Sequence, residues 1–569
     1  MPTERKMKKR KLKYLVFVFV LMMISLLYVF GLKPIKSVFF DEYYLADEPV
    51  LAIFYKNGKV SAVENGNVLH YKAVLKNTGI WSKGSFEEAM KDHDLLITVE
   101  TWLKGWSGNK NVLQEISGGH FDENIRKLGE KIAASKHKIY IRWAPDMEVP
   151  AMEYPWQFQS SAYYCSTFNY FARKIKQYAP KAFIVWGPSG YPGDTEYWPG
   201  NKEVDLASIT LGSRSEYNLN VYPRDKTIPA MLKHKLHRLR FIDKPVLIIK
   251  GSELPAFNFQ QQWLKDQKNY METFKSTVYS IDNYTDTGET KPFRKHLKIG
   301  VFDPNRKLVA QNFIQVEHIF TDWGEIQRGD FEKKFLEVIN RRHEPIVTME
   351  PWREINGTED RRVLTKILAG KYDAEIRKLF RIISIAKSTV YLRWMHEMEI
   401  PIYRYSWQSQ DPVMYINTFR YFMQFEGGPG KNVRKIWGPA GDRGSIDFWP
   451  GDDVVDYISI AIYGLPDKNI TDPAKQETFR AAFERKFRRM RFSDKPLFIT
   501  EFGVKGPEEF QDKWLKGAAE TIKHYPQVFG ICYFNLQDNP KAWGSIKAPD
   551  WSITSNSMRR FADALKKEL

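Results

Sequence analysis

The sequence predicts an α/β protein in which an N-terminal transmembrane helix is followed by two tandem (β/α)8 barrels. Three observations lead to this fold class: an apolar run near the N-terminus, an internal repeat of about 250 residues, and eight β-rich runs that alternate with helical patterns in the second repeat. The length of 569 residues suits this organisation, because one such barrel takes about 250 residues.

The apolar run Tyr14–Leu32 contains no charged residue and is about long enough to cross a bilayer core. The basic segment 1–13 precedes it, so the positive-inside rule places the N-terminus in the cytoplasm and the remaining chain outside. A cleaved signal peptide is the alternative, but this run exceeds the usual length of about 7 to 15 residues. We therefore expect a single-pass protein of the cell membrane whose barrels are periplasmic or extracellular.

The internal repeat has a nearly constant offset. Residues 139–157 (IYIRWAPDMEVPAMEYPWQ) align without a gap with residues 390–408 (VYLRWMHEMEIPIYRYSWQ), an offset of 251, which also pairs Trp186 with Trp437. So long a match in one register indicates a duplication. The expected domains after the membrane segment are a degenerate barrel over 48–280, a polar linker over 281–297 and a second barrel over 298–569.

The second repeat contains eight short β-rich runs, separated by segments with apolar residues at helical spacing. These runs are Lys298–Phe302, Phe313–Phe320, Pro345–Glu350, Thr389–Trp394, Val433–Trp437, Val455–Tyr463, Pro496–Glu501 and Val528–Phe534. In a barrel of eight parallel strands, the chemistry lies where the strands end. The functional residues are therefore expected at the carboxyl ends of these runs.

The composition excludes several classes of protein. Two cysteines in 569 residues allow neither a disulfide scaffold nor a four-cysteine zinc site. The formal charge of +18 raises the question of nucleic acid, but the basic residues outside the N-terminus are dispersed and the predicted topology is outward. No Walker loop, GxGxxG, HExxH or CxxC motif is present. We expect no cofactor, no metal and no nucleic-acid partner, and the oligomeric state is open.

Two glutamates occupy the expected rim of the second barrel. Glu397 directly follows the fourth predicted strand, and Glu501 ends the seventh. Retaining glycoside hydrolysis needs such a pair, one carboxylate as nucleophile and one carboxylic acid as general acid and base. A single strand-terminal glutamate is usually a surface cap or an ion-pair partner. The joint placement of two after strands four and seven favours catalysis.

These motifs resemble glycoside hydrolase family 26. The second repeat has RWMHE at 393–397, an aromatic motif with Trp407, Tyr463 within SIAIYG, and EFG at 501–503. The resemblance covers the second repeat well and the first only in its scaffold. It departs where the usual HEMNG reads HEMEI here and where the loop to Trp407 is longer.

The resemblance implies a role for each motif residue. Glu397 is implied as the general acid and base, and Glu501 as the nucleophile. His396 is implied to lie near the reacting sugar, Tyr463 to orient Glu501 by a hydrogen bond, and Arg393 to support them from below.

Tryptophans are the expected lining of a sugar-binding groove, because indole rings stack on the CH faces of sugars. For any single tryptophan, packing in the barrel is at least as good an explanation. Trp352 and Trp407 follow strand ends and are the preferred candidates, with Asn535 and Trp551 near the eighth strand. The remaining candidates are Trp437, Trp449 and Trp543.

The first repeat lacks the residues that carry the chemistry. The replacements are Pro145 for His396, Asp146 for Glu397, Gly212 for Tyr463 and Lys250 for Glu501. A lysine cannot act as an anionic nucleophile. We expect this repeat to be an inactive barrel that binds glycan, packs against the second repeat, or holds it away from the membrane.

The sequence thus predicts a membrane-anchored, retaining endo-β-glycosidase that acts on a β-linked polysaccharide. The resemblance implies β-mannan, mixed-linkage β-glucan or β-1,3-xylan as the substrate class, and the anchor suits the cell's own exopolysaccharide. The rival hypothesis is a non-catalytic scaffold in which both repeats only bind glycan during polysaccharide assembly or export.

Overall fold

The structure is a computed structural model of the whole chain. It describes residues 42–54, 60–62, 68–77, 86–103, 111–213, 227–255, 257, 260, 262, 263, 265–267, 297–400, 404–464, 477–490, 492–540, 543, 545 and 547–566. The chain divides into two compact units, Met1–Lys235 with Asp243–Asn269, and Leu236–Ile242 with Tyr270–Leu569. Each unit is described below by itself.

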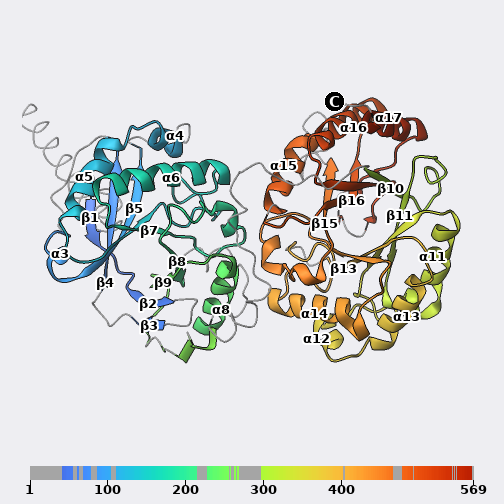
Figure 1. Cartoon of the computed structure of the whole chain (residues 1–569), viewed down its shortest axis with the longest axis horizontal. Helices are drawn as coiled ribbons and strands as arrows, with labels where there is room; N and C mark the ends of the chain where they lie inside the picture. Colours follow the sequence, from blue (N-terminus) through green and yellow to red (C-terminus); the bar gives the residue numbers. More distant parts are fainter. Residues whose placement is uncertain are drawn as a thin grey trace, which may run out of the picture. The chain divides into compact units, whose positions relative to one another are not determined.

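The second unit contains a closed barrel of eight parallel strands (Figure 1). In barrel order these are β10 (Lys298–Phe302), β11 (Val316–Thr321), β12 (Glu344–Met349), β13 (Val390–Trp394), β14 (Val433–Trp437), β15 (Tyr457–Gly464), β16 (Leu497–Val504) and β17 (Val528–Phe534). Each strand pairs with its neighbours in the chain, and β10 pairs with β17 to close the circle. The predicted (β/α)8 barrel is confirmed here, with three strands that have the predicted bounds.

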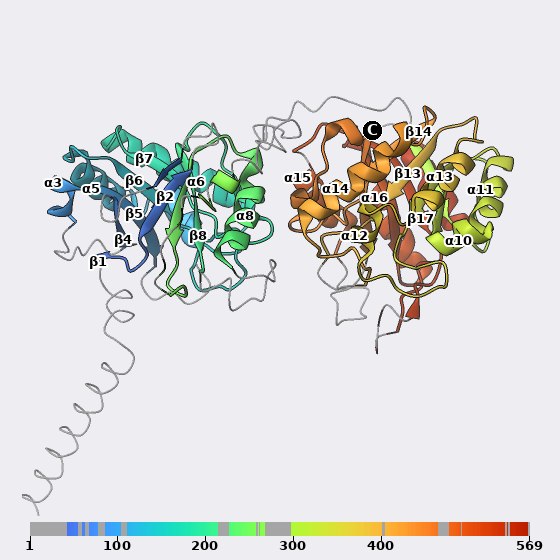
Figure 2. The same cartoon turned by 90° about the horizontal axis from the view of Figure 1, so that it is seen from below.

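Helices surround this barrel on the outside (Figure 2). They are α10 (Trp323–Arg328), α11 (Asp330–Asn340), α12 (Val363–Leu368), α13 (Asp373–Ile383), α14 (Pro412–Gln424), α15 (Phe479–Met490), α16 (Glu508–Lys523) and α17 (Ser555–Lys566). Their apolar residues recur every three or four positions, as Ile376, Leu379 and Ile383 do in α13, so each helix buries one face against the strands. The other face is polar and carries charges of both signs, as Glu375 and Arg377 do in α13.

The interior of the barrel is packed where the strands begin. A cluster of buried side chains, one from each of six strands, fills this end; it consists of Val316, Ile346, Tyr391, Ile436, Phe498 and Cys532. Because this end is apolar, the polar side chains of the interior lie toward the carboxyl ends of the strands. A candidate site of the barrel lies at that end.

The strands of the barrel are not paired over equal lengths. Strands β11 and β12 share a register of six residue pairs, whereas β10 pairs with β11 only at Gly300–Val316 and Val301–Glu317. Strands β14 and β15 likewise pair only at Ile436–Tyr457 and Trp437–Ile458. The barrel therefore has two short seams on opposite sides.

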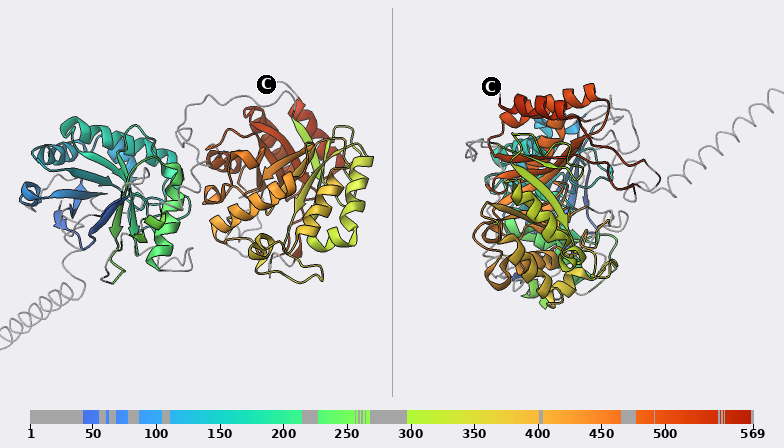
Figure 3. Two further views of the ribbon diagram at one scale, coloured as in Figure 1. Left: turned by 60° about the horizontal axis from the view of Figure 1, so that its bottom comes forward. Right: turned by 90° about the vertical axis from the view of Figure 1, so that its right-hand side faces the viewer.

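The first unit contains a nine-stranded sheet rather than a closed barrel (Figure 3). Its strands, in spatial order, are β1 (Glu42–Leu45), β4 (Val68–Lys76), β5 (Asp94–Trp102), β6 (Ile139–Trp143), β7 (Phe183–Trp186), β8 (Leu206–Leu211), β9 (Val246–Lys250), β2 (Val50–Phe54) and β3 (Val60–Ala62). Strands β4 to β9 are parallel, as in a barrel. The helices of this unit are α3 (Ala89–Asp92), α4 (Val112–Ser117), α5 (Asp122–Ala133), α6 (Ser161–Tyr178) and, as far as Lys235, α8 (Ile228–Arg238).

The described part of this unit is therefore an open sheet whose parallel strands β4 to β9 fit part of a barrel, and the complete barrel predicted over residues 48–280 is not seen in it. Strand β2 runs antiparallel to β9 and occupies the edge at which a further parallel strand would add. The residues 251 positions before β17, 277–283, lie outside the described residues. The predicted linker 281–297 also falls almost wholly outside them.

Among the described residues, no helix has both the length and the hydropathy needed to span a membrane. The predicted transmembrane segment Tyr14–Leu32 and the basic segment 1–13 lie outside these residues.

Candidate active site

The loop after β13 carries the first candidate catalytic residue in a left-handed backbone conformation. Met395 and Glu397 have φ angles of 45° and 55°, which residues other than glycine seldom adopt. Two side chains hold the loop: the indole N–H of Trp407 donates to the carbonyl of His396 at 2.7 Å, and Nε2 of Gln408 donates to the carbonyl of Glu397 at 3.1 Å. Strained backbone persists where the surroundings fix it, as these bonds do here.

A buried carboxylate anchors the same loop to its neighbour. Oε1 of Glu399 accepts hydrogen bonds from the backbone N–H groups of Gly441 and Asp442, at 2.9 and 3.0 Å, and from the hydroxyl of Ser445 at 2.9 Å. Burial raises the pKa of Glu399 above its usual range. Glu399 thus fixes the loops after β13 and β14 relative to each other.

The second candidate catalytic residue, Glu501, is held at both oxygens. Its Oε1 accepts from the guanidinium of Arg393 in a buried ion pair, and its Oε2 accepts from the hydroxyl of Tyr463 at 2.9 Å. Arg393 also donates to the hydroxyls of Thr348 at 2.8 Å and Thr500 at 3.0 Å. A carboxylate whose two oxygens both accept hydrogen bonds is fixed in rotation, which suits a nucleophile.

A buried histidine joins the hydrogen-bond network of Arg393 through Thr348. His318 lies within 3.1 Å of the carbonyl of Thr500 at Nδ1 and within 2.7 Å of the hydroxyl of Thr348 at Nε2. Because a carbonyl only accepts, Nδ1 carries the proton and Nε2 accepts from Thr348. Burial lowers the pKa of His318 well below its ordinary value, which agrees with this neutral ring.

The two carboxyl groups line one cavity of about 580 Å³ at the carboxyl ends of the strands. This volume is ordinary for a small-molecule or oligosaccharide site. The residues of this cavity that concern the chemistry are Glu350, Trp352, His396, Glu397, Tyr405, Tyr463 and Glu501.

A second cavity, of about 280 Å³, adjoins the other side of Glu397. Its lining includes Tyr463, Asp442 and Lys486 but not Glu501. Glu397 therefore borders both cavities, whereas Glu501 borders the larger one alone.

The surroundings separate the protonation states of the two glutamates. Burial raises the pKa of Glu397 to about 8, and the negative charge of Glu501 adds to this effect. Glu397 is thus mostly protonated at neutral pH, beside a Glu501 whose negative charge is paired with Arg393. A protonated and an ionised carboxyl in one cavity form the acid and nucleophile combination of glycoside hydrolysis.

A third carboxyl group, Glu350, lies in the cavity and was not singled out as functional from the sequence. Burial, together with the charge of Glu501, raises the pKa of Glu350 to about 7. Its Oε1 lies 3.7 Å from Nε2 of His396. Since burial and the nearby Arg393 lower the pKa of His396 well below its ordinary value, this ring is neutral and the contact is not an ion pair. The available signal was the position of Glu350 at the end of the third predicted strand.

Aromatic and charged side chains form one wall of the cavity. Trp352 is half-buried, and its ring lies 5.9 Å from that of Tyr405 at 80°. The guanidinium of Arg353 lies 4.4 Å from the centre of the Trp352 ring. Arg404 forms a long ion pair of 3.7 Å with Asp538, and both residues line the cavity. The structure thus adds Tyr405, Arg404 and Asp538 to the residues considered from the sequence.

The structure brings five of the nine predicted site residues to the cavity wall, namely Trp352, His396, Glu397, Tyr463 and Glu501. Arg393 lies directly below them. The other three lie behind the wall: Trp407 is fully buried under the loop after β13, and Trp551 packs against the ring of Tyr463 at 4.7 Å. Asn535 is also buried and donates to Asp303 at 2.9 Å.

Trp437 and Trp449, also considered for the groove, are buried and pack on each other at 5.1 Å. Within the part of the chain that the structure describes, no group of three or more His, Cys, Asp or Glu side chains has the arrangement of a metal site.

Comparisons with known proteins give partial matches. The chain is 28% identical over 155 residues to a β-1,3-xylanase from Alcaligenes sp., which is 26% of this chain and 29% of the relative. It is 30% identical over 151 residues to the β-1,3-xylanase TXYA from Vibrio sp., which is 25% of this chain and 28% of that relative. The chain thus spans less than a third of the length of either curated relative.

Among solved structures, a GH26 β-mannanase from Bacteroides ovatus is similar with 15% identity and a TM-score of 0.35, over 48% of this chain and 88% of that one. No protein-family profile matches the chain.

Proposed function

We propose that the second unit is a retaining endo-β-glycosidase of the family 26 type, with Glu501 as the nucleophile and Glu397 as the general acid and base. The observation that carries this proposal is the opposed state of the two carboxyl groups in one cavity. Glu501 is held by an ion pair with Arg393 and a hydrogen bond from Tyr463, while burial raises the pKa of Glu397 to about 8.

In the first step, an oxygen of Glu501 attacks the anomeric carbon of the sugar, and the bond from that carbon to the glycosidic oxygen breaks. The carboxylic acid of Glu397 donates its proton to the departing oxygen, so the leaving chain departs as an alcohol. Glu397 becomes a carboxylate. Glu501 loses its negative charge as it forms the bond to the sugar, so the hydrogen bond from the Tyr463 hydroxyl becomes weaker.

In the second step, the carboxylate of Glu397 removes a proton from a water molecule. The water oxygen attacks the anomeric carbon, and Glu501 departs as a carboxylate again. Two inversions at the same carbon retain its configuration. The ion pair with Arg393 stabilises the charge that returns to Glu501.

The two cavities support cleavage within a chain rather than at its end. Glu397 borders both cavities, and a general acid must lie beside the bond that breaks. We place the attacked sugar in the larger cavity with Glu501 and the leaving chain in the smaller one.

The proposed substrate is a β-linked polysaccharide of the β-mannan, mixed-linkage β-glucan or β-1,3-xylan class. The partial likeness to two β-1,3-xylanases adds weight to the last. The half-buried indole of Trp352 at the cavity wall suits a sugar ring in each case.

We further propose that the two units arose by duplication and that residues 14–32 anchor the chain in the cell membrane, with both units outside. The nearly constant offset of 251 residues supports the first point, and the uncharged apolar run behind a basic segment supports the second. Fractionation of cells that express the full chain tests the anchor, because deletion of residues 14–32 then moves the protein from the membrane to the soluble fraction.

The test of the activity is release of reducing ends from β-1,4-mannan, mixed-linkage β-glucan and β-1,3-xylan by the full chain in mild detergent. Proton NMR of the fresh product gives its anomeric configuration. We expect a β product from one of these polymers, as a double displacement requires. An α product would exclude the nucleophile role of Glu501.

The matched variants are Glu501→Ala and Glu397→Ala. We expect each to lower kcat on the polymer by at least about 10³-fold. Added azide should restore turnover of an aryl β-glycoside in both, with an α-glycosyl azide from Glu501→Ala and a β-glycosyl azide from Glu397→Ala. Equal activity of Glu501→Ala and the wild type would rule out the proposed mechanism.

A further inference from the structure

The loop after β6 in the first unit has the same backbone as the loop after β13 in the second. Asp146, 251 positions before Glu397, has a φ of 57° where Glu397 has 55°. Its N–H donates to the carbonyl of Gly187 at 2.9 Å, and that of Glu397 donates to Gly438 at 2.8 Å. The framework of the active-site loop is therefore present in both units.

An aromatic group stands beside this loop in the first unit. The rings of Tyr154 and Trp156 are stacked at 4.8 Å, and the ring of Trp102 lies 6.1 Å from each. Trp156 is held from behind, because its N–H donates to the carbonyl of Pro145 at 2.7 Å. Trp102 and Tyr154 are half-buried, and the N–H of Trp102 donates to Oε2 of Glu100 at 3.3 Å.

The second unit has the same arrangement around its cavity. Tyr405 and Trp407 are stacked at 4.6 Å, and Trp352 lies 5.9 Å from Tyr405. In that unit, Trp352, Tyr405 and Glu350 line the cavity of the two catalytic candidates. The first unit thus keeps the wall of the site, including its carboxyl group.

In the first unit, the positions of Tyr463 and Glu501 hold other residues, and a neighbouring side chain fills the space at the position of Tyr463. At the position of Tyr463 the first unit has Gly212, and a Cβ atom there would lie 2.2 Å from the side chain of Leu254. Leu254 therefore occupies the direction that a tyrosine ring would take. Lys250 stands at the position of Glu501, at the end of β9.

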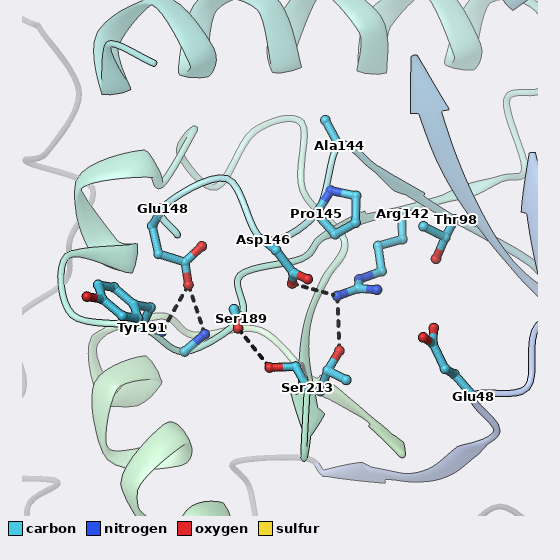
Figure 4. A network of polar contacts seen from close by, with 12 residues as sticks. Glu48, Thr98, Arg142, Ala144, Pro145, Asp146, Glu148, Ser189, Tyr191 and Ser213 are labelled. Carbon is cyan, nitrogen blue, oxygen red and sulfur yellow. Dashed lines mark hydrogen bonds and ion pairs between the residues drawn. The ribbon is translucent and has the colours of Figure 1, made fainter. Parts of the chain in front are cut away.

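The polar side chains in the interior of the first unit also make contacts with one another. The guanidinium of Arg142 points toward the carboxyl group of Asp146 (Figure 4), with Nη2 3.5 Å from Oδ1. The same Nη2 donates to the hydroxyl of Thr210 at 3.1 Å. Burial raises the pKa of Asp146 and of Glu100 above their usual ranges.

We propose that Glu100, Trp102 and Tyr154 form a non-catalytic binding site for a neutral β-linked oligosaccharide at the ends of β5 and β6. This proposal rests on the proposed function for the class of sugar. The indole and phenol faces stack on sugar CH groups, and Glu100 accepts from sugar hydroxyls. The absence of an anionic group at position 250 leaves the bound chain uncleaved.

The test is isothermal titration calorimetry on the full chain carrying Glu501→Gln, which binds without turnover. The probes are β-1,3-xylohexaose, β-1,4-mannohexaose and a mixed-linkage β-glucan hexasaccharide. We expect two sites per chain for one probe. Trp102→Ala should remove one site or raise its Kd at least about tenfold, while Trp352→Ala should weaken the other.

Tyr170→Ala, which truncates an aromatic side chain on the outer helix α6, is the matched control and should leave both sites unchanged. Trp102→Phe should keep part of the affinity, and thermal unfolding identifies variants that fail to fold. A single site that is lost with Trp352→Ala and insensitive to Trp102→Phe and Trp102→Ala would overturn the proposal and leave the hydrolase intact. Binding of none of the probes would also overturn it.

The two proposals fail in different assays. If the wild-type chain releases no reducing ends but shows two sites that respond separately to Trp102→Ala and Trp352→Ala, the proposed hydrolase is wrong and the binding site stands.

Discussion

The hydroxyl of Tyr463 donates a hydrogen bond of 2.9 Å to Oε2 of Glu501, the oxygen that does not pair with Arg393. Tyr463 lies in β15 and Glu501 in the neighbouring strand β16, where the two side chains face the same cavity. This bond fixes the plane of the carboxylate, and it makes the hydroxyl a positioning group rather than a reactant.

Tyr463→Phe is therefore expected to lower kcat by about 10- to 100-fold with little change in KM, because a fixed nucleophile contributes to the chemical step. The matched control is Tyr533→Phe, which removes a hydroxyl that donates to the carbonyl of Trp551 at 2.7 Å. That variant should lose about 1 kcal/mol of stability and keep its kcat. Steady-state kinetics and denaturant unfolding separate the two effects.

The pH profile of kcat/KM should fall above about pH 8, with a slope of one, because the pKa of Glu397 is raised to about 8 and its protonated form is the acid. An aryl β-glycoside with a good leaving group needs no such acid in the first step. Its cleavage by Glu397→Gln should show no basic limb in the rate of the first step. A basic limb that persists in this variant would assign the titration to another group.

Glu350 should make the second unit less stable as the pH rises. Its folded-state pKa of about 7 exceeds its ordinary value of 4.5, so the stability that its protonated form provides is complete below about pH 4.5 and is lost as the pH rises through 7. Glu350→Gln should therefore raise the unfolding free energy at pH 8 by up to about 3 kcal/mol and leave it unchanged at pH 4.

The control for this sign is Glu354→Gln. Hydrogen bonds from Lys366 and Lys371 lower the pKa of Glu354 to about 2, so its contribution is present above the ordinary pKa and is lost in acid. Thermal unfolding at pH 4 and pH 8 should show no stabilisation by this variant at pH 8. If Glu350→Gln and Glu354→Gln both stabilise the protein at pH 8, the loss of a negative charge explains the result and the raised pKa of Glu350 does not.

The first unit should not become active when the four missing residues are restored. The variant Pro145→His, Asp146→Glu, Gly212→Tyr, Lys250→Glu, in the Glu501→Ala background, introduces a tyrosine ring where Leu254 stands. We expect no release of reducing ends and a lower melting temperature. Recovery of activity would show that Leu254 moves aside without cost.

The sequence indicated the second barrel well, because its signals are local. Three of its eight strands have the predicted bounds, and Glu397 follows its strand as expected, whereas Glu501, predicted to end its strand, lies within β16. The periodic apolar residues of helices such as α13 fix which face is buried. Such patterns need no knowledge of distant contacts.

The rest depended on contacts that no local pattern shows. Trp407 and Trp352 both follow strand ends, yet Trp407 is buried beneath its loop while Trp352 lines the cavity. The antiparallel course of β2 beside β9 joins residues almost 200 positions apart. Glu350 has a raised pKa because it is buried near Glu501, and it also lies close to His396. The position of a glutamate at a predicted strand end does not show these neighbours.

The two short seams of the barrel divide it into two four-stranded halves. Glu397 follows β13 in the half formed by β11 to β14, whereas Glu501 belongs to β16 in the half formed by β15 to β17 and β10. Arg393 bridges the interior from one half to the other. The spacing of the two catalytic candidates therefore depends on this crosslink as well as on the backbone, and a barrel that opens at its seams would separate acid from nucleophile without unfolding either half.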